Sequence, residues 1–567
     1  MKKIFTLLLA TLTLLSVAQT AGWSWANKLS GPRDEKSYRM TIDKDNHIYT
    51  TGEFETKLVV GTNTIIANGG ANKDGVLVKY DGNGNVLKTL TCGSAVNAVG
   101  VEERITCVTV DTNKNVYIAG YFNRNNFVIG AGTGSASINL ITGYTKALFI
   151  SKLDSNFNVL WAKPIFSGSI PTAQQLKVDA SGNPYLVGRF DYVVVDTYTT
   201  TGTYYPGFEG MSILKFNTNG ILQWYKHFKG SGVFSSIEGI AFDTNDEPYV
   251  IGSFQYNAVI DTYSFTVTGT NCDDSFLAKL SKNTGNINWL TPIISNTRDM
   301  AKGITISPNN EVYVGGFFGT SYYNYTGTLT IGSQSVIGNN YSGDLFLFKS
   351  DTAGNVLWLK KYGGISSELF KAITLDHSNN VVMTGQGNAN TNFGTGFMSE
   401  EIFVAKVDNN GNTIYAKSAG KSSSSDLVSD ICADSYDNVY INGIFNNNTL
   451  FGTYNLIADL TYGTSSTDMF CAKLSTSAIP TSLGEANLLH NNVVAYPNPA
   501  HNTISVRFSV LSNTTEKNEI KIYGVLGNLI SSTVTDKNEI SIDVSTLPNG
   551  IYFMQIENNE RVKFIKE

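Results

Sequence analysis

A short phrase recurs seven times along this chain, and that repetition restricts the fold more than any other feature. Typical copies read "VTVDTNKNVYIAGYF" and "AFDTNDEPYVIGSF". Each has an apolar run, a turn rich in Asp, Asn and Gly, and the pattern Tyr-x-x-Gly-x-Phe, which together predict a β-hairpin of strands a and b. The recurring glycines are Gly52, Gly120, Gly188, Gly252, Gly316, Gly385 and Gly443. Their average spacing, (443 − 52)/6 or about 65 residues, indicates a tandem array.

A second phrase follows each of the first six copies, as in "DLFLFKSDTAGNVLWLKKYGG". It predicts another hairpin, of strands c and d. Strand c carries a lysine each time, at Lys79, Lys152, Lys215, Lys279, Lys349 and Lys406. Strand d carries a tryptophan in four copies, at Trp161, Trp224, Trp289 and Trp358. We interpret the repeated lysine as solvated or paired across units, with a place in a central channel as the alternative.

The seventh copy stops after strand c, in "DMFCAKLSTSAIP" with Lys473, and its missing strand d stands near the N-terminus. "WANKLSG" from Trp25 aligns without a gap with "WLKKYGG" from Trp358. The count is then 1 + 24 + 3 = 28 strands, or seven fours. This predicts an all-β, seven-bladed β-propeller over residues 22–475, closed by the N-terminal strand, with Trp25 buried beside Lys473.

Strand b is apolar on both faces, as expected of a blade between two neighbours, and its glycine is expected to leave room for a neighbouring side chain. The repeats resemble the SBBP-type (seven-bladed β-propeller) repeats of secreted bacterial proteins over roughly residues 22–475. That resemblance implies the fold and no particular activity.

The first eighteen residues have the pattern of a secretory signal peptide. Lys2 and Lys3 precede an apolar run from Ile4 to Leu15, and Ser16 and Ala18 suit cleavage after Ala18. The run is too short to span a bilayer, and no later stretch is apolar enough, so we expect no transmembrane span. No cysteine lies near the cleavage point, which argues against a lipoprotein anchor.

Composition and motifs exclude several functions. The net charge is −6 without a basic block, so nucleic acid is not expected as a partner. The five cysteines form no C-x-x-C pair and are interpreted as small buried residues; a Cys92–Cys107 disulfide would be incidental. The histidines lack metal-ligand spacing, and no G-x-S-x-G or H-E-x-x-H occurs. We expect no cofactor, metal site or catalytic motif, and leave calcium binding in the Asp- and Asn-rich turns open.

The b–c connections are long, whereas the a–b and c–d turns are tight, so the b–c face is the candidate ligand face. Tyrosine and asparagine suit stacking on sugar rings and hydrogen bonding to their hydroxyl groups. The candidate ligand-binding residues are Tyr204, Tyr205, Phe208, Tyr322, Tyr323, Tyr325 and Tyr341. The alternative is that these connections form small extra hairpins and the aromatic residues pack on them.

After a linker at residues 476–492, residues 493–567 lose the repeat and alternate as in "TISVRF", which predicts a small β-sandwich. The segment resembles the C-terminal sorting domain of the type IX (Por) secretion system of Bacteroidetes. The matching residues are Tyr496, Pro497, Asn498, Pro499, Gly527, Gly550, Tyr552, Lys563 and Lys566. Gly524 departs from the family, which commonly has a polar residue there.

The resemblance implies export to the periplasm and passage through the outer membrane, with the type IX machinery as the partner. It also implies removal of the domain and release or anchoring to surface polysaccharide. We therefore predict a secreted or cell-surface propeller acting as a non-enzymatic binding module, with a glycan, polysaccharide or surface protein as ligand. The alternative is a lyase or glycosidase with a site assembled from several blades, and a deep pocket holding paired carboxylates would favour it.

Overall fold

The structure is a computed structural model. It describes residues 21–567 except 70–71, 97–99, 169–170, 192, 200–209, 231–234, 256, 267–272, 321–325, 340–342, 366, 389, 395–397, 399, 422–425, 462–465, 476–492, 497–498, 509–517, 525–528, 536, 538 and 557–559. The chain divides into two compact units at residues 478/479. The predicted signal peptide and linker lie outside the described residues. No helix in the described parts of the chain has the length and apolarity needed to cross a membrane.

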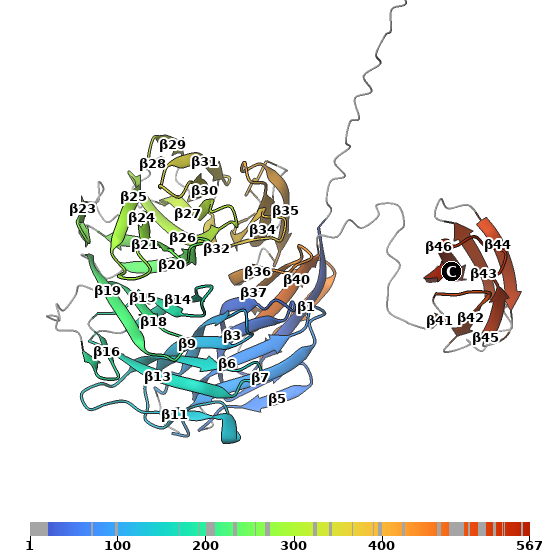
Figure 1. The fold of residues 1–567 in the computed structure, drawn as a ribbon, viewed down its shortest axis with the longest axis horizontal. Helices are drawn as coiled ribbons and strands as arrows, with labels where there is room; N and C mark the ends of the chain where they lie inside the picture. Colours follow the sequence, from blue (N-terminus) through green and yellow to red (C-terminus); the bar gives the residue numbers. More distant parts are fainter. Residues whose placement is uncertain are drawn as a thin grey trace, which may run out of the picture. The chain divides into compact units, whose positions relative to one another are not determined.

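The first unit is a ring of seven antiparallel sheets, each built on four strands in the order a, b, c, d (Figure 1). The a strands are β2 (Lys36–Ile42), β8 (Arg104–Val110), β14 (Thr172–Val178), β20 (Ser236–Phe242), β26 (Arg298–Ile306), β32 (Leu369–Leu375) and β36 (Leu427–Ala433). The b strands are β3 (Ile48–Glu55), β9 (Val116–Phe122), β15 (Pro184–Arg189), β21 (Pro248–Gln255), β27 (Val312–Thr320), β33 (Val381–Gln386) and β37 (Val439–Asn446).

The outer half of each blade follows the same order. The c strands are β6 (Lys73–Tyr80), β12 (Ala147–Leu153), β18 (Met211–Phe216), β24 (Asp273–Leu280), β30 (Asp344–Ser350), β34 (Ile402–Val407) and β40 (Thr467–Ser475). The d strands are β7 (Val86–Gly93), β13 (Val159–Ser167), β19 (Leu222–Gly230), β25 (Ile287–Ser295), β31 (Val356–Tyr362), β35 (Thr413–Ala419) and, in the seventh blade, β1 (Gly22–Ser30). The seven a strands contact one another in sequence, and β36 contacts β2, so the ring is closed.

The N-terminal strand closes the last blade in the predicted register. β1 pairs antiparallel with β40, and Trp25 lies opposite Lys473. The Trp25 indole N–H donates a hydrogen bond to the Gly82 carbonyl at 3.2 Å, and its ring lies 5.9 Å from that of Tyr440. Trp25 is half-buried rather than fully buried as predicted. The seven-bladed all-β fold is thereby confirmed.

Several b–c connections form an extra hairpin that extends the sheet of the preceding blade. The hairpin strands in these sheets are β4 (Lys57–Val60) with β5 (Asn63–Ile66), β10 (Phe127–Ile129) with β11 (Ala136–Ile138), β16 (Val193–Val195) with β17 (Tyr198–Thr199), β22 (Asn257–Ile260) with β23 (Tyr263–Thr266), and β28 (Thr328–Ile331) with β29 (Gln334–Ile337). β38 (Asn448–Phe451) and β39 (Tyr454–Ile457) pair only with each other. A short 3-10 turn, η1 (Gly132–Gly134), precedes β11. These b–c connections therefore form small extra hairpins, as the alternative interpretation of the sequence expected.

The repeated glycine of strand b lets strand a bulge toward it. Every a strand shifts register opposite this glycine, as between Ile105 and Cys107 opposite Gly120. A Cβ atom on Gly120 would collide with the Arg104 carbonyl and with the Phe149 ring of strand c. The other six glycines face the equivalent a-strand carbonyl. The glycine therefore makes room for the backbone bulge of strand a as well as for a neighbouring side chain, which the sequence had predicted.

Neighbouring blades are joined by the tryptophans of strand d. In five of the six tryptophans the indole N–H donates to a carbonyl in the c–d turn of the next blade, where a glycine with positive φ lies under the ring. The sixth, Trp23, donates to the Ser418 carbonyl in strand d of the sixth blade at 3.2 Å. The donors and acceptors are Trp25 and Gly82 (3.2 Å), Trp161 and Thr218 (3.1 Å), Trp224 and Lys282 (3.0 Å), Trp289 and Thr352 (3.0 Å), and Trp358 and Asn409 (3.1 Å). Between the first two blades, Lys88 replaces the tryptophan, Phe157 replaces the glycine, and the ammonium lies 5.8 Å from the ring.

The lysines of strand c lie over the tyrosine of strand b, except Lys406, which lies over Tyr415 of strand d. Their ion pairs are with acids of their own blade, and several also donate to a carbonyl in the c–d turn of the next blade. Lys473, for example, lies 5.2 Å from the Tyr440 ring and donates to the Gly82 carbonyl of the first blade at 3.0 Å. The Asp-rich a–b turns are capped by their own side chains: Asp111 Oδ1 accepts from the amides of Asn113 and Asn115, each at 2.9 Å. Cys92, Cys107, Cys432 and Cys471 are buried free thiols, so the Cys92–Cys107 disulfide does not form; Cys272 lies outside the described residues.

Carboxyl groups meet in pairs where one blade joins the next. A residue at the start of strand c of one blade faces one at the start of strand a of the following blade at five of the seven junctions. The pairs are Asp74 with Glu103, Asp274 with Asp299, Asp344 with Glu368, Glu401 with Asp426, and Asp468 with Glu35. At the other two junctions both positions lack an acid: they hold Ala147 with Pro171 and Gly210 with Ser235.

The second unit is a sandwich of two antiparallel sheets. One contains β41 (Val493–Tyr496), β42 (Thr503–Phe508) and β45 (Glu539–Asp543). The other contains β43 (Asn518–Gly524), β44 (Leu529–Thr535), β46 (Gly550–Ile556) and β47 (Glu560–Lys566). Its core includes Ile504, Ile522, Met554 and Phe564, which alternate with exposed or half-buried residues along their strands.

Candidate functional site

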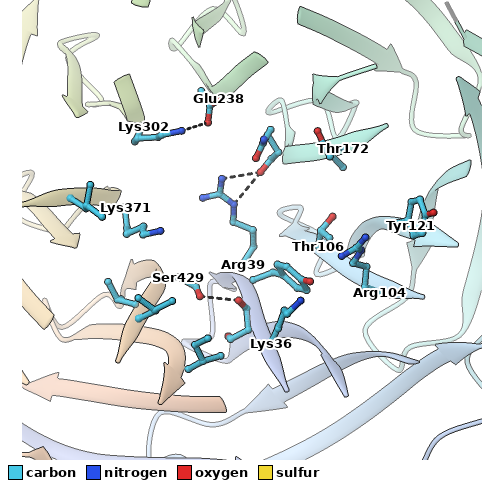
Figure 2. A pocket seen from close by; sticks show the side chains of 18 of the residues that line it. Lys36, Arg39, Arg104, Thr106, Tyr121, Thr172, Glu238, Lys302, Lys371 and Ser429 are labelled. Atoms are coloured by element: carbon cyan, nitrogen blue, oxygen red, sulfur yellow. Dashed lines mark hydrogen bonds and ion pairs between the residues drawn. The ribbon is translucent and has the colours of Figure 1, made fainter. Parts of the chain in front are cut away.

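The aromatic residues expected to bind a ligand lie outside the described parts of the chain. These are Tyr204, Tyr205, Phe208, Tyr322, Tyr323, Tyr325 and Tyr341. What the structure describes on the same side of the ring is a cavity of about 620 Å³ at one end of the central channel, which we call the channel cavity (Figure 2). Its size is within the range of small-molecule sites in proteins.

The channel cavity lies at the b–c end of the ring. Its lining comes from the first residues of the a strands, such as Lys36, and from the last residues of b strands, such as Tyr121. Lys36 is the cross-strand partner of Glu53, so the start of strand a and the end of strand b lie at the same height along the channel. All seven blades contribute an a-strand residue to the lining, including Thr106, Gln174, Glu238, Lys302, Lys371 and Ser429. The cavity and the long connections therefore share one face.

Basic side chains outnumber acidic ones among the described residues of the lining. Of the described residues that line the cavity, five are cationic (Lys36, Arg39, Arg104, Lys302 and Lys371) and one, Glu238, is a carboxylate. Glu53 lies just outside and pairs with Lys36 at 3.4 Å and with Arg104 at 3.6 Å. Since the chain as a whole carries a net charge of −6, this positive cluster is a local feature of the channel.

Arg39 forms the floor of the cavity. Its guanidinium crosses from the first blade to the third, where Nε and Nη2 donate to the Gln174 carbonyl at 3.1 and 2.9 Å (Figure 2). Nη1 lies 3.8 Å from Asp430 of the seventh blade. No a-strand residue deeper than the level of Arg39 is among the described lining residues. The planar guanidinium is thus held by three blades, and its place is set by the bulge that turns strand a inward.

Lys302 and Lys371 stand side by side on the fifth and sixth blades, and their environments differ. The Lys302 ammonium lies 2.9 Å from Glu238 of the fourth blade. Lys371 makes no ion pair with any described residue, and the charged groups that act on it are the cations Lys302 and Arg39. Burial lowers the pKa of Lys371, and the two neighbouring cations lower it further. Among the described residues, the Lys371 amino group therefore has two neighbouring cations and no carboxylate partner.

These side chains can bind anions but do not form a recognisable catalytic set. Glu238 is the one carboxylate among the described lining residues, and it is engaged by Lys302. None of the junction carboxyl groups is among the described residues that line the cavity. Across the described residues, no group of three or more His, Cys, Asp or Glu side chains is placed to hold a metal ion.

Sequence reasoning missed this site, although one repeat position signals it. The residue five places before the Asp or Ser that follows strand a is Tyr38, Thr106, Gln174, Glu238, Lys302, Lys371 or Ser429 in successive repeats. That position is polar or charged in most copies, whereas strand a is otherwise largely apolar. A polar column of this kind in the innermost strand predicts the lining of a channel.

Few of the sorting-motif residues can be followed as side chains. Pro497, Asn498 and Gly527 lie outside the described residues, and of Tyr496 and Lys563 only the backbone is described, in β41 and β47. Pro499 is exposed, and Gly550 pairs with Lys566 across β46 and β47. Tyr552 is buried, stacks on Phe564 with ring centroids 5.5 Å apart, and donates its hydroxyl to the Pro548 carbonyl at 2.7 Å. Tyr552 thus has a structural role in the sandwich.

Residues 494–567 match the family described as the secretion system C-terminal sorting domain. The protein is therefore exported by type IX secretion to the cell surface or the extracellular space. The resemblance seen in the sequence is confirmed for this segment.

The propeller has more distant similarities. An uncharacterized WD repeat-containing protein, L264, of Acanthamoeba polyphaga mimivirus is 24% identical over 474 residues, which cover 69% of this chain. The match spans about a third (34%) of that relative's length. A protein of unknown function from Dyadobacter fermentans is 9% identical with a TM-score of 0.37, covering 80% of this chain and 99% of its own. PorZ, a surface component of the type IX secretion system of Porphyromonas gingivalis, is 10% identical with a TM-score of 0.18, covering 96% and 100%.

Proposed function

We propose that the propeller is a non-enzymatic binding module that the C-terminal domain delivers to the bacterial surface. Its ligand, a polysaccharide or a surface protein, is bound on the b–c face. The observation that carries this proposal is the channel cavity, which opens on that face and is lined by side chains of all seven blades. Such a site, on a rigid ring and surrounded by long connections, is typical of ligand recognition.

The charges in the cavity favour binding over catalysis. Glycosidases and lyases of the alternative function need positioned acids and bases, whereas Glu238 is held in an ion pair with Lys302 at 2.9 Å. Arg39 is likewise engaged by Gln174 and Asp430. Fixed cations of this kind orient a bound anion without transferring a proton.

The proposal includes the domain boundaries predicted from the sequence. Residues 1–18 serve as the signal peptide, residues 22–475 as an SBBP-type propeller, residues 476–492 as a linker and residues 493–567 as a cleaved sorting domain in a member of the Bacteroidetes. The seven candidate aromatic residues of the b–c connections contact the ligand.

Two experiments test the proposal. The purified full chain is screened against polysaccharides and against surface proteins of the producing cell, and specific binding that is lost on replacing Tyr322, Tyr323 and Tyr325 by alanine is expected. Absence of any ligand in this screen would count against a binding function. Deleting residues 493–567 is expected to retain the protein in the periplasm, as measured by cell fractionation, and normal surface display would contradict the proposed role of this domain.

A further inference from the structure

We infer that the channel cavity is a binding site for an oxyanion group, a carboxylate, phosphate or sulfate, which is held by Lys371 with Lys302 and Arg39. The inference rests on the proposed function, because it names the chemical class of ligand for the site assigned there. Three features of the cavity carry it: a lysine without a carboxylate partner among the described residues, the arrangement of the cationic donors, and the opening of the site at one end.

The first feature is the contrast between Lys371 and the other cations of the cavity. Arg39, Arg104, Lys36 and Lys302 each have a carboxylate partner within 4 Å. Lys371 has none among the described residues, although it lies in the same enclosed space. An ammonium removed from bulk water without a counter-charge is costly, and an anionic ligand supplies that charge.

The second feature is the arrangement of donors. Lys371 and Lys302 project from neighbouring a strands, and Arg39 reaches the middle of the cavity from the opposite side (Figure 2). Lys302 and Arg39 are already oriented by Glu238 and by Gln174. An oxyanion seated among them would face ammonium groups from one side and the guanidinium from the other. Little side-chain ordering is then needed on binding.

The third feature is that the site is open at one end. Arg39 closes the floor, while the mouth lies on the side of the b–c connections. The volume of about 620 Å³ exceeds that of a single oxyanion, so the group it holds can be one end of a larger molecule. An acidic sugar chain or a phosphorylated surface molecule can present such a group through the mouth.

The test is isothermal titration calorimetry on the purified full chain. The probes are inorganic phosphate, sulfate and a trisaccharide of galacturonic acid, each against a chloride background. Wild-type protein is expected to bind at least one probe at one site per chain. Lys371→Met should weaken that binding by roughly tenfold to a hundredfold, the range expected for loss of a charged hydrogen bond, and Lys371→Arg should restore most of it.

Lys44→Met is the matched control. It removes the same charge from an exposed a–b turn at the opposite end of the blade and should leave binding unchanged. Circular dichroism establishes that each variant is folded. Failure of the wild-type protein to bind any probe, or equal weakening by Lys371→Met and Lys44→Met, would overturn the inference.

The results separate this inference from the broader proposal. Binding of a small anion that depends on Lys371, together with an empty polysaccharide and surface-protein screen, supports the oxyanion site and counts against the proposed function. A ligand found in the screen whose affinity is unaffected by Lys371→Met supports the proposed function and overturns the oxyanion site. Among the three probes, the one bound most tightly identifies whether carboxylate, phosphate or sulfate is preferred.

Discussion

The carboxyl groups of Glu35 and Asp468 meet, fully buried, at the seam where the last blade joins the first. The amides of Gly31 and Asp459 donate to Asp468 at 3.4 and 2.9 Å. Burial, followed by the neighbouring Asp468 carboxyl, raises the pKa of Glu35 to about 10. Two buried carboxylates so close cannot both be ionised without a large cost, so the pair holds a proton.

Stability should therefore fall as pH rises. Burial, reinforced by the second acid of each pair, raises the pKa of Asp74 to about 8 and that of Glu368 to about 7, from 3.8 and 4.5. Because the folded state holds these protons more tightly than the unfolded state, the protonated carboxyl groups contribute to the free energy of unfolding. This contribution is complete below about pH 4 and is lost as pH rises through 7 to 8. Urea unfolding is expected to show a falling free energy of unfolding over this range.

Replacing one member of a pair by its amide should flatten this pH dependence. Asp74→Asn keeps an acceptor for the Asn68 amide, which donates to Asp74 at 2.7 Å, and needs no shared proton. A difference of one pKa unit between the folded and unfolded states corresponds to about 1.4 kcal/mol in the free energy of unfolding. The variant has no titratable group at position 74, so it loses the contribution of this residue to the pH dependence. Asp45→Asn, on an exposed turn, is the control and should leave the slope as in wild type. An unchanged slope in Asp74→Asn would show that the pair carries no proton.

Trp25 should contribute to closure of the ring. Trp25→Ala removes the hydrogen bond to Gly82 and the contact with Tyr440, and is expected to lower the free energy of unfolding by about 2 kcal/mol. The measurement is chemical denaturation followed by circular dichroism. Leu160→Ala, at a position of strand d that is 54% exposed, is the control and should cost much less. Equal effects would mean that the N-terminal strand does not stabilise the ring through Trp25.

The glycine of strand b should not accept a side chain. Gly120→Ala places a methyl group against the Arg104 carbonyl and is expected to destabilise the protein by roughly 1–3 kcal/mol. Gly82→Ala is the comparison, because its added methyl would meet its nearest atom at 3.6 Å, an ordinary contact. Thermal unfolding of both variants measures the difference, and a harmless Gly120→Ala would refute the role of the bulge.

The first junction should be convertible to the tryptophan type. Lys88→Trp alone is expected to destabilise, because the Phe157 side chain occupies the place that glycine leaves open at the other junctions. Adding Phe157→Gly should recover most of that loss, and Phe157 already has a φ of 64°. A double-mutant cycle is expected to give a favourable coupling of about 1 kcal/mol. The same cycle with exposed Leu87 in place of Lys88 should give almost none.

The sequence predicts contacts within one repeat better than contacts between successive repeats. Contacts within one repeat, such as the pairing of Trp25 with Lys473, follow from aligning the phrases, because every copy has the same register. Contacts between successive repeats do not follow from that alignment. Asp74 faces Glu103, and Trp161 reaches Thr218, yet no single phrase contains both members of either pair.

The candidate site shows the same division. The long connections and the mouth of the channel cavity lie on the same face of the ring. The side chains that form the cavity come from a strand whose polar position changes identity from blade to blade, from Gln174 to Glu238 to Lys302. No motif describes such a set, because only closure of the ring brings its members together.

The pairing of β1 with β40 also determines when the ring can close as the chain emerges. A chain that emerges from its N-terminus presents β1 first and its partner only after the seventh repeat has appeared. Until then β1 is an open strand edge, able to pair with the wrong neighbour or with another chain. The last repeat therefore acts as a completion signal: a truncated chain cannot form the finished ring, and incomplete molecules remain distinguishable from complete ones by that unpaired edge.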